Sequence, residues 1–242
     1  MSNSSPDLSR RDFFKVSAAA IATVGVANFL KPSYATEVNV KTVALSNLPK
    51  APVEVAKSSE LVQKAWDYLL GEINSLHDLA LREKVFSFYQ NTVPTFMEQH
   101  QGSANVSKVY KMLLQEHLVD PALTDEAHLF PPLKDLNINP QPFFSAPGSG
   151  YGSHHAYPGG LATHTAVNVE ITKSILTTYS HIMDYEYGYD MAVAGQLLHD
   201  LAKPWVFQWN KDGSCLKEYS IAGTGAHHIF SIAEAIYRGM PA

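Results

Sequence analysis

Apolar residues recur three and four positions apart along much of the chain, which is the spacing of one face of an α-helix. The first clear example follows Ser58 and Ser59, either of which can start a helix together with Glu60. Its apolar positions are Leu61, Ala65, Tyr68, Leu69 and Ile73. The same spacing predicts further helices over residues 75–91, 103–118, 161–179, 190–202 and 228–238.

Other segments lack this spacing. Residues 36–58 contain prolines and little periodicity, which indicates a linker or an extended arm. Repeated prolines predict irregular structure over residues 120–150. Residues 205–209 and 216–219 flank the run Asn-Lys-Asp-Gly (210–213), which favours a β-hairpin with an Asp-Gly turn. The expected fold is therefore mainly α, a helical bundle with a small β-hairpin.

The first 35 residues have the parts of an export signal: a basic region, a short apolar run over residues 16–30 and the small-x-small site Ser33-Tyr34-Ala35. The run Ser9-Arg10-Arg11-Asp12-Phe13-Phe14-Lys15 resembles the twin-arginine signal, with Phe14 in place of leucine. The resemblance implies export to the periplasm by the twin-arginine translocase; the alternative is an anchoring or amphipathic helix. An apolar run of about 15 residues is too short for a stable membrane span.

Composition narrows the class of protein. The 242 residues are 45% hydrophobic and 17% charged, which supports a globular core. A formal net charge of −5 disfavours a nucleic-acid binder that depends on bulk electrostatics. The single cysteine, Cys215, cannot form an intramolecular disulfide or a thiolate zinc site. With 11 histidines in the chain, imidazole and carboxylate are the expected metal ligands.

Histidines occur in three segments on or beside predicted helices. The run Leu197-Leu198-His199-Asp200-Leu201-Ala202-Lys203-Pro204 places a histidine and a carboxylate side by side near a helix end. The other two of these segments contain His154, His155 and His164 upstream, and His227 and His228 downstream. Imidazole with carboxylate suits divalent metals. Side chains on facing helices of a bundle can bring such ligands together.

The motifs Gly-Gly-Leu-x-x-His-Thr, Leu-Leu-His-Asp-x-x-Lys and Gly-x-His-His-Ile, in this order, resemble the HD-domain superfamily of metal-dependent phosphohydrolases. The preceding His-His-Ala-Tyr and the run Glu218-Tyr219-Ser220 are most similar to the branch that contains HD-type exoribonucleases. The resemblance covers roughly residues 150–242. It implies a helical bundle with metal ligands on its inner helices.

The resemblance implies a role for each matching residue. His164 would be the first metal ligand, and His199 and Asp200 the second and third, with Asp200 able to bridge two ions. Lys203 matches a lysine that faces the substrate phosphate. Asp200 and Lys203 are therefore the expected catalytic residues, and Lys203 is also an expected substrate-binding residue.

Four histidines have less certain roles. His228 best matches the histidine that binds a second ion, and His227 is the nearby alternative. His154 and His155 would line the entrance, with His155 contacting substrate; the favoured alternative is that both are solvated loop histidines.

The expected activity is hydrolysis of a small phosphorylated substrate such as a nucleotide, by hydroxide bound to one or two divalent ions (Mn, Fe, Mg, Ni or Zn). The superfamily pattern includes a late aspartate ligand, whereas no aspartate follows Asp212. We therefore expect a signal over residues 1–35, a helical region with a proline-rich linker over 36–150, and an incomplete HD-like domain over 151–242. The alternatives are an HD-fold di-iron oxygenase and a non-catalytic remnant that acts as a binding module.

Overall fold

The computed structural model describes residues 43–95, 103–128, 140–150, 153–186, 188–209, 213–215, 217–218, 220–221 and 223–240. The predicted twin-arginine signal lies outside these residues. The chain divides into two units, Met1–Asn47 and Leu48–Ala242. The described residues of the first unit contain one 3₁₀ turn, η1 (Leu45–Asn47).

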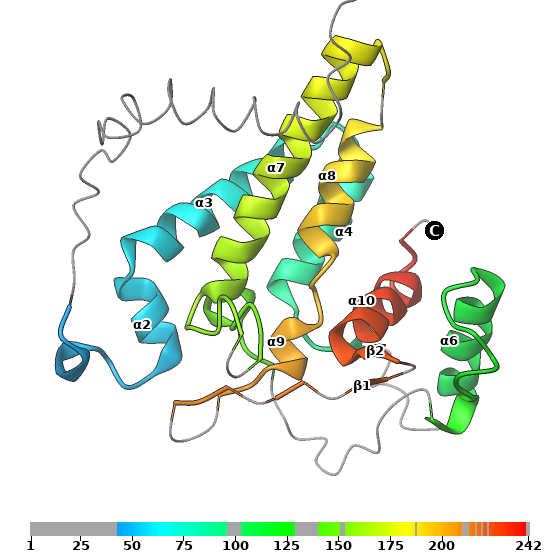
Figure 1. The fold of residues 1–242 in the computed structure, drawn as a ribbon, viewed down its shortest axis with the longest axis horizontal. Helices are drawn as coiled ribbons and strands as arrows, with labels where there is room; N and C mark the ends of the chain where they lie inside the picture. Colours follow the sequence, from blue (N-terminus) through cyan, green and yellow to red (C-terminus); the bar gives the residue numbers. More distant parts are fainter. Residues whose placement is uncertain are drawn as a thin grey trace, which may run out of the picture. The chain divides into compact units, whose positions relative to one another are not determined.

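The second unit is mainly helical, as the sequence predicted (Figure 1). Its α-helices are α2 (Pro52–Ser58), α3 (Glu60–Ser75), α4 (Leu79–Gln90), α6 (Ser103–Gln115), α7 (Gly160–Met183), α8 (Tyr189–Leu198), α9 (Lys203–Val206) and α10 (Ala226–Tyr237). Two 3₁₀ turns, η2 (Glu126–His128) and η3 (Phe143–Ser145), lie in the proline-rich region, which is otherwise irregular where it is described. Among the described residues, no helix has the length and apolarity needed to cross a membrane.

Helix α3 forms where the apolar spacing predicted it. Ser59 is its N-cap, because its hydroxyl accepts a hydrogen bond from the Val62 N–H at 3.4 Å. The residues that α3 buries are Val62, Ala65, Leu69, Glu72 and Ile73. Leu61 is 63% exposed, so the predicted face was wrong at its first position. Val62 occupies the buried position instead.

The larger apolar core joins α3, α4, α7 and α8, which lie side by side in Figure 1. Tyr89 on α4 stacks on Phe143 of η3, with ring centroids 4.1 Å apart. The hydroxyl of Tyr89 donates to the Leu197 carbonyl oxygen at 3.0 Å. This bond fixes the end of α8, directly before His199 and Asp200.

A second apolar core lies between α6, α9 and α10. Phe230 on α10 is fully buried. The ring of Trp205 on α9 packs edge-on against it, with ring centroids 5.0 Å apart. The Ser231 hydroxyl accepts a hydrogen bond from the Ala202 N–H at 3.1 Å. Helix α10 is therefore held against the turn that follows Asp200.

Two of the differences between predicted and observed boundaries have a clear physical reason. The helix predicted over 190–202 ends at Leu198, and residues 199–202 form a turn before α9. Pro204 prevents α8 and α9 from forming one continuous helix, because a proline inside a helix clashes with the carbonyl of the residue four positions earlier, here Asp200. The linker predicted over 36–58 is wrong for Pro52–Ser58, which form α2. A proline suits the first turn of a helix, where its missing N–H has no intrahelical partner.

The predicted β-hairpin is only partly present. Trp205 and Val206 belong to α9. In the part of this segment that the structure describes, the pairing is a single antiparallel bridge between Trp209 and Cys215. A short antiparallel pair follows, β1 (Ser220–Ile221) with β2 (Thr224–Gly225). This pair leads directly into α10.

Candidate metal centre

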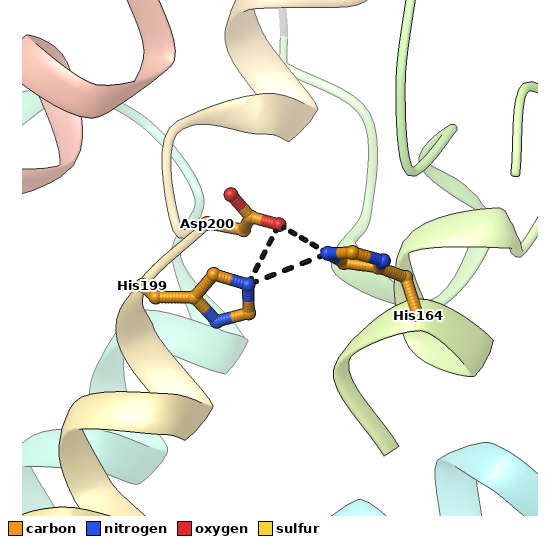
Figure 2. Close-up of side chains that lie close together, drawn as sticks. All are labelled: His164, His199 and Asp200. Atoms are coloured by element: carbon orange, nitrogen blue, oxygen red, sulfur yellow. Dashed lines mark hydrogen bonds and ion pairs between the residues drawn. The ribbon is translucent and has the colours of Figure 1, made fainter. Parts of the chain in front are cut away.

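Three side chains from two elements meet beside the larger core (Figure 2). His164 is on the second turn of α7, and His199 and Asp200 are in the turn after α8. One ligand atom from each residue lies within 4.8 Å of the other two. A His/His/Asp group of this kind can hold a divalent metal ion.

The Asp200 carboxylate is at the middle of this group and is only 2% exposed. Its Oδ2 lies 3.0 Å from Nε2 of His164 and 3.0 Å from Nε2 of His199. Among the described residues, none of the contacts of Oδ2 has the geometry of a hydrogen bond, although the Lys203 ammonium group also lies 2.6 Å from this oxygen. A buried carboxylate oxygen without a directed hydrogen bond, facing two imidazole nitrogens, fits a metal ligand.

Helix contacts orient the two imidazoles. The Nδ1 atom of His199 lies 2.6 Å from the Gln196 carbonyl oxygen, to which an Nδ1–H donates. In the neutral ring this bond leaves the Nε2 lone pair facing Asp200. The Asn168 amide nitrogen lies 3.1 Å from Nε2 of His164, one helical turn along α7.

The charges in the centre shift two pKa values. Burial raises the pKa of Asp200, but the close contacts with the His164, His199 and His227 rings outweigh burial and hold the pKa well below its usual range. Burial lowers the pKa of His199, but the Asp200 carboxylate and the Gln196 carbonyl raise it more, so its net pKa is raised. Asp200 is therefore ionised near neutral pH.

Lys203 is buried beside the same carboxylate. Its Nζ lies 2.6 Å from Asp200 Oδ2 and donates to the Gly148 carbonyl oxygen at 2.6 Å. The ammonium group therefore compensates the Asp200 charge and joins the 148–159 loop to the centre. Its expected contact with a substrate phosphate stays a prediction.

The third histidine segment approaches Asp200 from the other side. His227 is 8% exposed, and its Nε2 lies 3.2 Å from Asp200 Oδ1. His228 is exposed, with its ring centroid 3.9 Å from that of His227. The motif match favoured His228, whereas the structure brings His227 to the carboxylate. Adjacent helical residues point about 100° apart, so only one of the pair can face Asp200.

The two upstream histidines lie beside His164. The His155 ring centroid is 5.3 Å from that of His164, and its Nδ1 is 3.1 Å from the Tyr157 hydroxyl. His154 is exposed, 5.6 Å from the His164 ring. The pKa of the half-buried His155 is lowered. Burial is the largest cause, and the charges of His164, His154 and Lys203 add to it. Both therefore lie at the edge of the centre, and a substrate contact of His155 stays a prediction.

Sequence reasoning did not assign three residues that contact the centre: Asn168, Gln196 and Glu218. Asn168 is four residues after His164 and Gln196 three before His199, which is one helical turn in each case. That spacing is a signal that a search for supporting polar residues would have found. Glu218 was noted only as part of a motif, and its contact with His227 depends on the turn between β1 and β2.

One of three comparisons with known proteins found a relative, and it supports phosphoester hydrolysis in general. No protein-family model matches the chain. No solved structure matches it. Over 88 residues the chain is 31% identical to the dihydroneopterin 2′,3′-cyclic phosphate phosphodiesterase of Methanocaldococcus jannaschii. The match covers 36% of this chain and 34% of the relative, so the chain spans about a third of that protein's length. That distant homologue is a phosphodiesterase, which is consistent with the phosphohydrolase motifs.

Proposed function

We propose that this protein is an HD-type, metal-dependent phosphoester hydrolase, with small phosphodiesters as its first candidate substrates. The observation that carries the proposal is the convergence of His164 and His199 on the buried Oδ2 of Asp200. The distant phosphodiesterase supports the choice of reaction, and the substrate in its name favours a cyclic phosphate.

The chain's own residues prepare this reaction. His164, His199 and Asp200 would hold the cation, which when bound activates water and polarises the phosphoryl oxygens. Asp200 supplies the negative charge, because its low pKa keeps it ionised. Gln196 holds the His199 ring so that Nε2 faces inward. Lys203 keeps a positive charge beside Asp200, where it would oppose charge that develops on phosphate.

His155 is the proposed substrate contact at the edge of the centre. Its lowered pKa keeps the ring neutral near pH 7, so it can donate one hydrogen bond without adding charge. Tyr157 contacts its Nδ1, and the Tyr157 hydroxyl is itself 2.7 Å from the Thr163 hydroxyl on α7. These contacts link the ring to the helix that carries His164.

The test is hydrolysis by the purified chain after chelation and reloading with Mn²⁺, Fe²⁺, Mg²⁺, Ni²⁺ or Zn²⁺. Substrates are bis-p-nitrophenyl phosphate, a 2′,3′-cyclic nucleotide and p-nitrophenyl phosphate. Metal-dependent turnover of a diester that Asp200→Asn abolishes, and that the exposed-site control Glu83→Gln retains, is the expected result. Bound metal without hydrolysis of any substrate would reject the proposal. Oxygen uptake by the iron-loaded chain would then favour the oxygenase alternative.

We also propose that the chain is exported by the twin-arginine route, on the basis of the Arg10-Arg11 motif and the apolar run after it. Replacing both arginines by lysine keeps the charge and removes the guanidinium pair. Fractionation of cells that express the full chain tests this proposal. Periplasmic protein that disappears in the double variant is expected, and unchanged distribution would contradict it.

A further inference from the structure

A carboxylate outside the candidate centre contacts it through a histidine. Oε1 of Glu218 accepts hydrogen bonds from the backbone N–H of His227 at 3.1 Å and from its ring Nδ1. On the other side of the same ring, Nε2 lies 3.2 Å from Asp200 Oδ1. We propose that Glu218 is a positioning residue that holds His227 toward the metal-binding carboxylate. The inference rests on the metal centre proposed above.

The two bonds to one oxygen fix the ring. The N–H of His227 belongs to the first turn of α10 and has no partner within the helix, so the carboxylate is held there by the backbone. An Nδ1–H that donates to the carboxylate leaves Nε2 of the neutral ring with its lone pair toward Asp200. Two lone-pair atoms at this separation repel each other unless a cation or a proton lies between them. The ring is therefore arranged to act together with Asp200 Oδ1 on a positive charge.

Gly225 supplies the space that Glu218 needs. A Cβ at this position would lie 2.7 Å from Oε1 and 2.8 Å from Oε2 of Glu218. The φ angle of Gly225 is −63°, which any residue adopts, so the site requires glycine for space. A side chain here would displace the carboxylate without changing the chemistry of Glu218 or His227. Gly225→Ala is therefore an independent variant for the same contact.

Glu218 could instead serve only to cap the N-terminus of α10 from a distance, since the N-cap residue, Gly225, has no side chain that could do so. A cap alone predicts lower thermal stability and unchanged metal binding. A positioning role predicts that metal affinity falls as well, because partners of ligating histidines typically contribute about 10–100-fold to metal affinity. The two roles therefore differ in a measurement that does not depend on activity.

The experiment uses the full chain and Mn²⁺ as the probe, with affinity measured by calorimetry for wild type, Glu218→Gln, Gly225→Ala and the exposed control Glu83→Gln. We expect both variants at the contact to weaken Mn²⁺ binding by about 10–100-fold and the control to match wild type. Wild-type affinity in Glu218→Gln and Gly225→Ala, with a lowered melting temperature, would reduce Glu218 to a helix cap and overturn the inference.

A second measurement uses only the wild-type chain, so it does not depend on whether a variant folds. Long-range ¹H–¹⁵N spectra of the Zn²⁺-loaded wild-type chain report which ring nitrogen of His227 carries the proton. A protonated Nδ1 is expected, and a proton on Nε2 with a bare Nδ1 would overturn the inference. If the wild-type chain binds Mn²⁺ but hydrolyses no phosphoester, the proposed function fails while both readouts still decide the role of Glu218.

Discussion

The Nε2 atoms of His164 and His199 face each other at 3.4 Å, next to a carboxylate oxygen that lies 3.0 Å from each. Two imidazole nitrogens at this distance need a proton or a cation between them and the carboxylate. The helices α7 and α8 bring them together, although the two residues are distant in sequence. The pair therefore accounts for both the metal affinity and the pH dependence expected below.

A bound divalent ion should stabilise the folded chain. At a free Mn²⁺ concentration of about 100 times Kd, binding to the native state alone contributes about 2.7 kcal/mol. For a chain of this size that corresponds to a rise of about 5–10 °C in melting temperature. Differential scanning calorimetry with and without Mn²⁺ measures the shift.

The same scans test which residues bind the ion. His164→Ala, His199→Ala and Asp200→Asn should each remove most of the shift, whereas the exposed Glu83→Gln should keep it. A shift of wild-type size in Asp200→Asn would mean that the ion binds elsewhere.

The metal-free protein should be stabilised by His199 at low pH. The folded-state pKa of His199 lies above its ordinary 6.5, because Asp200 and the Gln196 carbonyl outweigh the effect of burial. Its stabilising effect is therefore complete below about pH 6.5 and is lost as pH rises through the raised pKa. Asp200 does not change charge as pH rises through the raised pKa of His199, because its own pKa is lowered. The stability that ionised Asp200 contributes is lost only at more acidic pH.

His155 and His228 have lowered pKa values, so their effects have the opposite sign and are lost as pH falls. The measurement is therefore the difference in free energy of unfolding between wild type and His199→Gln, obtained by urea denaturation in the presence of a chelator. The wild-type advantage should be larger at pH 6 than at pH 9. Mn²⁺ affinity should change in the opposite direction, since the metal competes with the proton. An advantage that grows with pH would contradict the raised pKa.

Helix periodicity predicted the helices well because it depends on local burial. It could not place the end of α8 at Leu198, since the residues up to Ala202 continue the apolar spacing. Pro204 indicates only that one helix does not continue through the Asp200 carbonyl into α9, and the turn between α8 and α9 carries His199 and Asp200. That turn directs both side chains toward α7.

The candidate site was predictable where neighbours in sequence are also neighbours in space. His199 and Asp200 are adjacent, and the motif order pointed to His164. The choice between His227 and His228 depends on the rotation of α10, which contacts with α6 and α9 set. The bond from Lys203 to the Gly148 carbonyl joins segments far apart in the chain. Contacts of that kind leave no periodic signal.

Two glycine substitutions should have opposite effects. A Cβ at Gly160 would lie 1.9 Å from the His155 carbonyl oxygen, a backbone atom that cannot move freely. Gly160→Ala should therefore cost about 1–3 kcal/mol or more and displace His155. Gly195 is inside α8 and its Cβ would meet nothing within 4 Å among the described residues, so Gly195→Ala should stabilise by about 0.5–1 kcal/mol. Urea denaturation compares them, and equal effects would contradict the close packing of the 148–160 loop.

Arg238 should be a large contributor to stability, because it joins α10 to the end of α4. Its Nε donates to the buried Glu234 at 2.5 Å, and its guanidinium lies 4.4 Å above the Phe88 ring. It also donates to the carbonyl oxygens of Asn91 and Val93, at 2.9 and 3.1 Å. Carbonyls at a helix C-terminus lack intrahelical partners and favour a nearby cation.

Arg238→Met should therefore destabilise the chain by about 3–5 kcal/mol, because it removes one partner of a largely buried ion pair with Glu234. The matched control is Lys57→Met, which removes an ion pair with Glu54 at 2.9 Å whose side chains are 56% and 53% exposed. Exposed pairs contribute about 0–1 kcal/mol, so the control should change little. Glu234→Gln added to Arg238→Met should recover part of the loss, since it removes the buried charge that Arg238 compensates in the wild-type chain. Urea denaturation of wild type and the three variants measures these losses, and a loss in Arg238→Met no larger than in Lys57→Met would show that burial at α10 does not strengthen the pair.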